Sequence, residues 1–267
     1  ASDGTVGLVR PSEQPAELIS IDRHGSVTPI RVLPAPASAY FANWSLLGGS
    51  ADRQKFAFLL RASGGQELFT YDAMRSTVTR VSQGTGASAN PTWSADGRRI
   101  FFASFAGARV WDIYAASSTE ASPAQRILPP SDQWRWPCAV SPDGRLILFA
   151  EGMDSSTDLW VAPLDGSAPP QRVTNTPFRE TDGKFSPDGH WIAYTSTESG
   201  RTDVYVRSFP IAPDRIPISS GGGAMPAWTP NGQEIFYRGT GSMFSVKLVK
   251  TPSGGLEASA PQPLFPI

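Results

Sequence analysis

The chain has 267 residues and a formal net charge of −1, from 23 Lys and Arg against 24 Asp and Glu. This balance argues against a nucleic-acid binder, which normally carries a clear basic excess. A single cysteine, Cys138, excludes an internal disulfide framework and a thiolate zinc cluster. No apolar run approaches the roughly 18 residues of a membrane helix, and no signal peptide begins the chain. If the protein is exported, its signal or anchor is therefore expected outside this chain.

Short strands joined by many turns are the expected elements. The sequence holds 25 glycines and 25 prolines beside a 40% share of hydrophobic residues, which is enough to build a core. No stretch keeps a helical period for three turns, whereas β-branched and aromatic residues cluster in short runs.

A turn motif recurs along the chain: an apolar residue, a hydroxyl residue, then x-Asp-Gly or x-Asn-Gly. Its clear copies centre on Ser94, Ser141, Ser186 and Thr229, which are 47, 45 and 43 residues apart. A degenerate copy, Asn43-Trp44-Ser45, lies 49 residues before Ser94. Asp bonds its own backbone and Gly takes positive φ in such a sequence, so each copy predicts a tight turn between two strands.

A second motif follows each turn and consists of an acidic, an aliphatic and usually an aromatic residue. Its copies, weaker at both ends of the chain, begin at Glu17, Glu67, Asp112, Asp158, Asp203 and Ser242. Each unit of about 45 residues predicts four strands, and four-stranded units of this length are typical of propeller blades.

We therefore predict an all-β fold, a single six-bladed β-propeller of four-stranded antiparallel blades over residues 1–267. The blades are expected at about 1–35, 36–83, 84–130, 131–175, 176–219 and 220–267. The first blade shows three recognisable strands, at residues 5–10, 17–22 and 27–33. It is therefore predicted to be incomplete, and the ring is expected to close in an unusual way between the first and last blades.

The turn and acidic motifs together resemble the repeat of the TolB-like family of WD40-like propellers. Residues 141–145 (Ser-Pro-Asp-Gly-Arg) with residues 158–161 (Asp-Leu-Trp-Val) match that repeat in full. The resemblance covers nearly the whole chain, and it implies a fold rather than an activity, because propellers carry many functions.

A narrower resemblance involves the C-terminal part. Residues 198–210, 218–223, 234–238 and 261–265 resemble the C-terminal propeller of bacterial eukaryotic-like serine/threonine kinases. In that family a cytoplasmic kinase is followed by a membrane helix and by this propeller outside the membrane, and similar propellers follow winged-helix transcription regulators. The resemblance implies an extracytoplasmic, periplasmic-side module tethered through a helix outside this chain. The chain has no kinase motif, so any kinase activity would lie elsewhere.

Residues repeated in every unit are interpreted as structural. The turn residues Asp96, Asp143 and Asp188 are expected to stabilise their own turns rather than hold a metal. The recurring acids Asp112, Asp158 and Asp203 are expected to be architectural, and Trp44, Trp93, Phe185 and Trp228 to pack between blades. The two histidines form no zinc motif, so neither a cofactor nor a metal site is predicted.

Residues that break the repeat are the candidates for a binding site. The connections that enter the innermost strands should surround the mouth of the central channel. The candidate ligand-binding residues there are Tyr40, Phe41, Asn90, Trp134, Arg135, Trp136, Arg179, Glu180 and Asp182. Aromatic residues interleaved with Arg are typical of binding surfaces, although such aromatics could instead seal the blade ends.

The charges at this mouth suggest a ligand type. In an extended segment the indoles of Trp134 and Trp136 face one way and Arg135 the other. Arg135 and Arg179 would attract a carboxylate, a phosphate or a sugar acid, unless Glu180 and Asp182 pair with them. Replacing both arginines by alanine is expected to abolish binding with little change in melting temperature.

Three functions remain open at this point. The favoured one is a non-enzymatic, monomeric binding module for a protein or a small polar or anionic ligand, acting as the sensor of a membrane-anchored kinase or regulator, without nucleic-acid or membrane contact. The second is a carbohydrate hydrolase or lyase that uses Glu180 and Asp182, with Glu151, in the channel. The third is a structural platform. No spacing fixes two carboxylates at the roughly 5–9.5 Å that glycosidases need.

Overall fold

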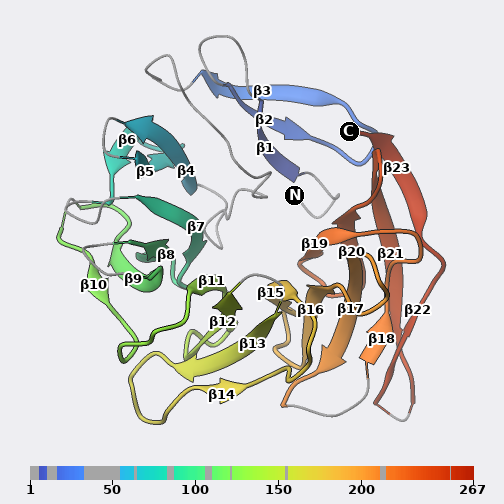
Figure 1. The fold of residues 1–267 in the computed structure, drawn as a ribbon. Helices are drawn as coiled ribbons and strands as arrows, with labels where there is room; N and C mark the ends of the chain where they lie inside the picture. The colour runs from blue at the N-terminus through green and yellow to red at the C-terminus, as the bar shows by residue number, and fades with distance from the viewer. Residues whose placement is uncertain are drawn as a thin grey trace.

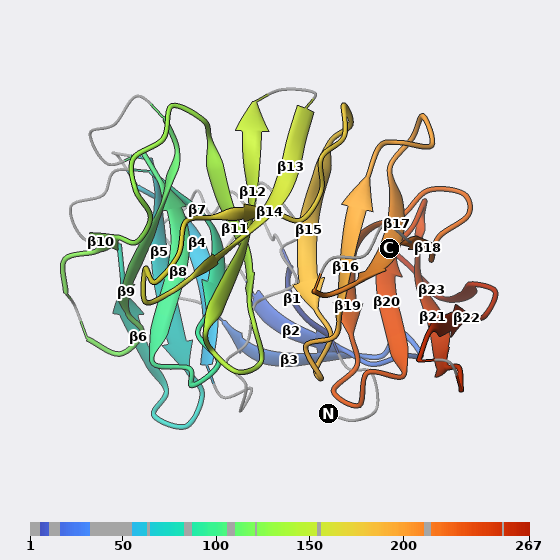
Figure 2. The same ribbon diagram turned by 90° about the horizontal axis from the view of Figure 1, so that it is seen from below.

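The computed structural model describes residues 6–10, 17–32, 55–62, 65–82, 87–105, 110–120, 122–153, 156–210, 215–252 and 254–267. All regular elements in these ranges are β-strands, and they form six antiparallel sheets. The sheets stand around a common axis in chain order (Figures 1 and 2), which confirms the predicted all-β propeller. The described segments contain no helix that could cross a membrane.

The sheets differ in the number of strands. Two have three strands in the described residues: β1 (Val6–Arg10), β2 (Glu17–Ile21) and β3 (Val27–Val32), then β4 (Lys55–Ala62), β5 (Gly65–Asp72) and β6 (Thr77–Arg80). The third sheet joins β7 (Ser88–Trp93), β8 (Arg99–Ser104), β9 (Asp112–Ser117) and β10 (Gln125–Arg126). The fourth joins β11 (Arg135–Val140), β12 (Leu146–Met153), β13 (Ser156–Pro163) and β14 (Gln171–Arg172). The fifth joins β15 (Glu180–Phe185), β16 (Trp191–Ser196), β17 (Asp203–Ser208) and β18 (Arg215–Pro217). The sixth joins β19 (Ala224–Trp228), β20 (Glu234–Arg238) and β21 (Ser242–Lys250), with β22 (Leu256–Ala258) and β23 (Gln262–Pro266) both paired to β21.

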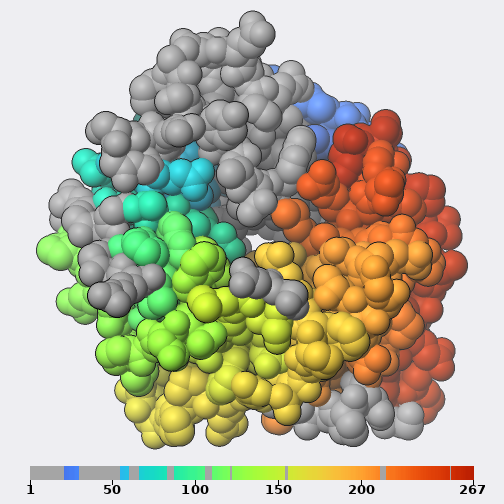
Figure 3. All heavy atoms as spheres, in the orientation of Figure 1, coloured from blue at the N-terminus to red at the C-terminus, as the bar shows by residue number. Residues whose placement is uncertain are grey.

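The core lies between neighbouring sheets. One cluster joins Leu148 and Leu159 of the fourth sheet to Phe185 and Ile192 of the fifth, and the indole of Trp228 donates to the Lys184 carbonyl across the next interface (3.1 Å). Trp93 packs likewise between the second and third sheets. The predicted packing of these aromatic residues is therefore confirmed, while Trp44 lies outside the described residues. The strands β7, β11, β15 and β19 lie toward the axis, and the space-filling view shows an opening at the centre of the ring (Figures 1 and 3).

The turns between first and second strands share one set of hydrogen bonds. In the fourth sheet, Ser141 Oγ donates to Asp143 Oδ1 (2.5 Å) and accepts from Leu146 N (2.9 Å), while Asp143 Oδ1 accepts from Arg145 N (3.0 Å). Gly144 closes the turn with a φ of 74°, a region that favours glycine. The same set recurs around Ser94, Ser186 and Thr229. The turn aspartates are thus structural, as predicted.

The recurring acidic residues of the fourth and fifth sheets bind the segment that follows the outer strand of their own sheet. Asp203 Oδ1 accepts from Ser219 Oγ (2.7 Å) and from Gly222 N (3.0 Å), both just beyond β18. Asp158 Oδ1 accepts in the same way from Thr174 Oγ1 and Thr176 N. Because these carboxylates are buried and hydrogen-bonded within their own sheets, the prediction that they are architectural is confirmed.

The first and last sheets meet through side chains. Arg23 Nη2 lies 3.0 Å from Glu234 Oε2, and Ile21 packs against Phe236, Met243 and Phe265. In the described residues the first sheet has three strands, as predicted, and no strand pairing joins it to the sixth. The expected strand around Asn43–Ser45 in the second sheet lies outside the described residues.

Candidate functional site

The two ends of the propeller are built differently. First strands run toward the Ser-x-Asp-Gly turns, which we call the turn end, and second strands run back to the opposite, loop end. Most predicted site residues lie near the start of a first strand and hence at the loop end. Tyr40 and Phe41 lie outside the described residues, so their part in a site stays a prediction.

The innermost strands carry β-bulges at their centres. Asn90, Asp182 and Met225 have positive φ values of 48°, 57° and 56°, and each lies where the first strand carries one residue more than its partner. All three precede the hydroxyl of the turn motif by four residues. Pro137 holds that place in β11, where the ring fixes φ at about −65°, and the register shift there lies between Pro137 and Ala139. Asn90 and Asp182 therefore occupy equivalent bulge positions on the innermost strands β7 and β15. A bulge changes the direction of the side chain that it carries.

Arg135 is buried between the third and fourth sheets. Its Nε lies 2.5 Å from Glu151 Oε2, its Nη1 donates to the Pro129 carbonyl (2.6 Å), and Nη1 lies 3.7 Å from Asp112 Oδ1. The side chain is only 9% exposed. The guanidinium is therefore surrounded by protein acceptors, which differs from the predicted position at the channel mouth.

Arg179 and Glu180 face opposite ways, as consecutive strand residues do. Arg179 is exposed, and its backbone pairs with Thr197 through two hydrogen bonds. Glu180 is 1% exposed and its Oε1 accepts from Thr176 Oγ1 (2.6 Å) and Ser196 Oγ (3.2 Å). The structure therefore separates these two residues: Arg179 belongs to the surface and Glu180 to the interior between the fourth and fifth sheets.

A run of aromatic rings covers the loop end of the third and fourth sheets. The centroids of Trp134 and Trp136 are 6.1 Å apart, those of Trp136 and Trp111 5.0 Å, and those of Trp111 and Phe105 5.8 Å. The three indoles are half-buried. The predicted orientation, with both indoles on one side and Arg135 on the other, agrees with this arrangement. Sequence reasoning missed Trp111 and Phe105, although Trp111 directly precedes the acid of the second motif.

Two exposed apolar side chains continue this surface. Met153 ends β12 and is 45% exposed, and Phe178 precedes β15 and is 38% exposed. The backbone ties these segments together, because Gly152 N donates to the Trp134 carbonyl (3.0 Å) and Thr157 N to the Phe178 carbonyl (3.3 Å). We call the six side chains the loop-end surface: Phe105, Trp111, Trp134, Trp136, Met153 and Phe178.

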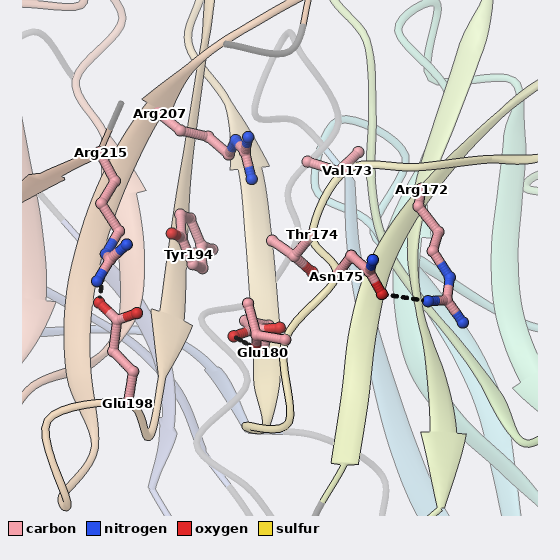
Figure 4. Close-up of a pocket in the computed structure, with 10 residues that line it drawn as sticks. Arg172, Val173, Thr174, Asn175, Glu180, Tyr194, Glu198, Arg207 and Arg215 are labelled. Carbon is pink, nitrogen blue, oxygen red and sulfur yellow. Dashed lines mark hydrogen bonds and ion pairs between the residues drawn. The ribbon is translucent and has the colours of Figure 1, made fainter. Parts of the chain in front are cut away.

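A separate cavity of about 350 Å³ lies between the fourth and fifth sheets (Figure 4). Its lining comprises Arg172, Val173, Thr174, Asn175, Thr176, Glu180, Tyr194, Glu198, Arg207 and Arg215. Burial raises the pKa of Glu180, against hydrogen bonds that lower it. Burial also raises the pKa of Tyr194, so its hydroxyl is neutral. None of these residues except Glu180 was a sequence candidate.

The carboxylates considered for catalysis have separate surroundings. Glu151 is paired with Arg135, Glu180 with hydroxyl groups, and Asp182 accepts a hydrogen bond from Thr181 Oγ1 (3.4 Å). Within the described ranges, no group of three His, Cys, Asp or Glu side chains is placed to hold a metal ion.

No protein-family model matches the chain. An uncharacterized protein of Agrobacterium fabrum is 28% identical over 127 residues, which are 47% of this chain and 42% of that protein. The Tol-Pal system protein TolB of Desulfosudis oleivorans is 30% identical over 84 residues, 32% of this chain and 19% of that protein. Each match thus spans less than half of the relative's own length.

Among solved structures, TolB from Acinetobacter baumannii superposes with a TM-score of 0.70 at 19% identity, over 97% of this chain and 63% of the other. A TolB-type protein from Agrobacterium tumefaciens gives 0.69 at 16%, over 96% and 88%. An oligogalacturonate lyase in complex with manganese gives 0.59 at 15%, over 96% and 73%. The chain therefore has a TolB-like β-propeller fold, a fold that it shares with an enzyme.

Proposed function

We propose that this chain is a non-enzymatic protein-binding propeller whose partner docks on the loop-end surface. The observation that carries the proposal is the run of four aromatic rings in contact across the third and fourth sheets, with exposed Met153, Phe178 and Arg179 on segments that are hydrogen-bonded next to it. Aromatic residues, Met and Arg are the types enriched in protein interfaces, and contiguous exposed apolar patches mark interaction sites. The similarity to a protein of the Tol-Pal system supports a protein partner.

The bulged residues of the channel strands extend the proposed site inward. Asn90 and Asp182 offer polar groups at equivalent positions near the axis. We include them, together with Trp134, Trp136 and Arg179, and we leave out Arg135 and Glu180, whose polar atoms face the protein interior. A polar rim around an aromatic centre is the usual anatomy of such interfaces.

Site-specific photo-crosslinking in cells tests the docking surface. A benzophenone amino acid at Phe178 should trap one discrete protein, and the same group at Met74, which is 77% exposed in the β5–β6 turn at the other end, should trap none. Trp134→Ala in the crosslinking chain should abolish the adduct. Equal adducts at both positions, an adduct that survives Trp134→Ala, or none at Phe178 would overturn the proposal.

We also propose that the domain acts on the extracytoplasmic side and belongs to a longer membrane-tethered protein. The TolB-like fold supports the location, and the resemblance of the C-terminal part to kinase-associated propellers favours a kinase as the attached domain. The sequence of the whole gene product tests the attachment: a kinase domain and a membrane helix before Ala1 would support it. Protease protection of the domain in spheroplasts would contradict the location.

The enzyme alternative calls for a second catalytic carboxylate near Glu180. Of the two candidates, Glu151 forms an ion pair with Arg135, and Asp182 lies on the bulge of β15. Neither carboxylate shares the surroundings of Glu180. Release of reducing ends or unsaturated products from polygalacturonate by the purified chain, lost in Asp182→Asn, would favour the enzyme over the binding module.

A further inference from the structure

The cavity between the fourth and fifth sheets shares no residue with the loop-end surface. One wall is formed by residues 172–176, at the end of β14 and beyond it, and the rest of the lining comes from the fifth sheet between β15 and β18. Of the lining residues, Arg172, Asn175 and Arg215 are exposed, so a solute can reach the cavity past them. The volume of about 350 Å³ lies near the lower end of the range of small-ligand pockets.

The arginines of the cavity and Glu198 already interact with other protein groups. Arg215 Nε lies 2.5 Å from Glu198 Oε1, and Arg172 Nη1 lies 3.6 Å from Asp158 Oδ2. Arg207 also has an interaction within the protein. These charges are therefore compensated by the fold itself, and the cavity needs no ionic ligand to balance them.

Glu180 is the exception among the charged residues of the lining. It is 1% exposed, and its Oε1 accepts from Thr176 Oγ1 (2.6 Å) and Ser196 Oγ (3.2 Å). Its Oε2 has no hydrogen-bond partner among the described residues. A buried carboxylate oxygen without a donor is costly, so this atom of a cavity-lining residue is the natural acceptor for a donor group of a ligand.

The surrounding charges favour a donor that is itself neutral. A cation bound to Glu180 would also lie near the three guanidinium groups of the lining, and an anion would lie near the Glu180 carboxylate. A hydroxyl group donates to a carboxylate without adding a charge. It also accepts hydrogen bonds, and each guanidinium has five N–H donors, more than the ion pairs described above use. A compact molecule with several hydroxyl groups therefore suits both kinds of wall.

The remaining walls suit the body of a small ring. The Tyr194 ring is buried and packs against Tyr205 with centroids 6.0 Å apart. Val173 and Thr174 are buried on the facing side (Figure 4). A ligand between these walls would place its carbon skeleton against an aromatic ring and an aliphatic side chain, while its hydroxyl groups reach the polar residues.

We propose that this cavity binds a neutral monosaccharide, with one sugar hydroxyl donating to Glu180 Oε2 and the sugar ring between Tyr194 and Val173. The site goes beyond the proposed protein-binding function, and it is independent of the loop-end surface. Neither a partner on that surface nor any catalytic step is needed for the sugar to bind.

Calorimetric titration of the 267-residue chain with five neutral sugars tests the proposal: D-glucose, D-galactose, D-mannose, D-xylose and L-rhamnose. At least one should bind at a single site with a Kd below about 1 mM. D-glucuronate and D-glucosamine offer a similar ring with a negative or a positive charge. Each should bind at least about tenfold more weakly than the best neutral sugar.

Glu180→Gln is the decisive variant. Glutamine keeps the shape and an oxygen for Thr176 and Ser196, but its amide group places a donor where Oε2 accepts. The fold is therefore expected to be retained, which thermal unfolding checks, while the sugar should bind at least about tenfold more weakly. Among the singly deoxygenated forms of that sugar, one should lose about tenfold in affinity for the wild type and nothing further for the variant. Glu257→Gln, an exposed change on β22, should leave the Kd unchanged.

Asn175→Trp tests the location without touching a buried residue. Asn175 is exposed and lines the cavity, so a large ring there should block the sugar. Gln171→Trp, an exposed change on β14 outside the lining, should not. The proposal is overturned if none of the five sugars binds, if glucuronate or glucosamine binds more tightly than all of them, or if Glu180→Gln or Asn175→Trp leaves the Kd within about twofold.

Discussion

The turn end and the loop end of this propeller use side chains in opposite ways. At the turn end, the Ser141 hydroxyl and the Asp143 carboxylate form hydrogen bonds within their own turn, and the other three described copies of the motif repeat these bonds. At the loop end, Trp134, Met153 and Phe178 make no such repeated set and leave apolar area exposed or half-exposed. A repeated residue is thus one that the fold uses in each blade, whereas an unrepeated residue is available for a partner.

Arg135 is the exception that sharpens this comparison, since it is unrepeated and yet structural. Arg135→Met removes the cation between Asp112 and Glu151 and leaves two carboxylates at a buried interface. Breaking a buried ion pair from one side costs about 3–5 kcal/mol of unfolding free energy. Urea unfolding monitored by tryptophan fluorescence measures it.

The matched control for that change is Arg145→Met at the turn end. The Arg145 side chain is 85% exposed, so its replacement should shift the unfolding free energy by no more than about 0.5 kcal/mol. Equal midpoints for the two variants would contradict the structural role of Arg135. The sequence-based expectation that both Arg135 and Arg179 can be replaced without loss of stability is therefore withdrawn for Arg135 and stays a prediction for the exposed Arg179.

Ser141→Ala tests the turn end of the comparison, because it removes a small side chain that is used in the turn. The change deletes the donor to Asp143 Oδ1 and the acceptor of Leu146 N. With roughly 1 kcal/mol for each hydrogen bond, the unfolding free energy should fall by about 1–2 kcal/mol. Ser156→Ala, at an exposed position in the β12–β13 hairpin, should change it little. If Ser156→Ala lowered the unfolding free energy as much as Ser141→Ala, the turn hydrogen bonds of Ser141 would not account for the loss.

The same contrast explains what the sequence could predict. The turns, the acidic motif and the aromatic residues between blades depend on local motifs that recur in register, so the sequence alone predicts them. The position of Arg135 could not, because Trp134-Arg135-Trp136 looks like an exposed binding segment. Its burial depends on Asp112 in the preceding blade and Glu151 on the adjacent strand, partners that no local pattern identifies.

The candidate site was predictable only in part for the same reason. The alternation of side chains along a strand predicts that Arg179 and Glu180 point to opposite faces. It does not predict that Glu180 lines a cavity together with Tyr194 and Val173, which come from two different blades. Phe105 and Trp111 joined the loop-end surface through ring contacts with Trp136 and its neighbours. Such contacts depend on how blades pack side by side, which the repeat does not specify.

Asp188 gives the smallest effect and tests whether a turn-end carboxylate is confined to its own turn. Burial by itself raises the pKa of Asp188, but hydrogen bonds from Lys250 Nζ, Ser186 Oγ and His190 N outweigh it and lower the pKa to about 2, from an ordinary value of 3.8. The Lys250 contact (2.7 Å) comes from β21 in the next blade. A carboxylate with a lowered pKa in the folded state stabilises the fold above its unfolded pKa. That stabilisation is lost as the pH falls from about 4 toward 2.

Lys250→Met should therefore raise the pKa of Asp188 and shrink the loss of stability on acidification. Because the Lys250 side chain is 65% exposed, solvent screening limits the change to less than about 1 kcal/mol. Unfolding free energies at pH 7 and about 2.5 give this difference, with Lys247→Met, an exposed change on the same strand, as the control. If both variants lose as much stability on acidification as the wild type, Asp188 acts only within its own turn. A smaller loss confined to Lys250→Met would show that one turn carboxylate also links two blades.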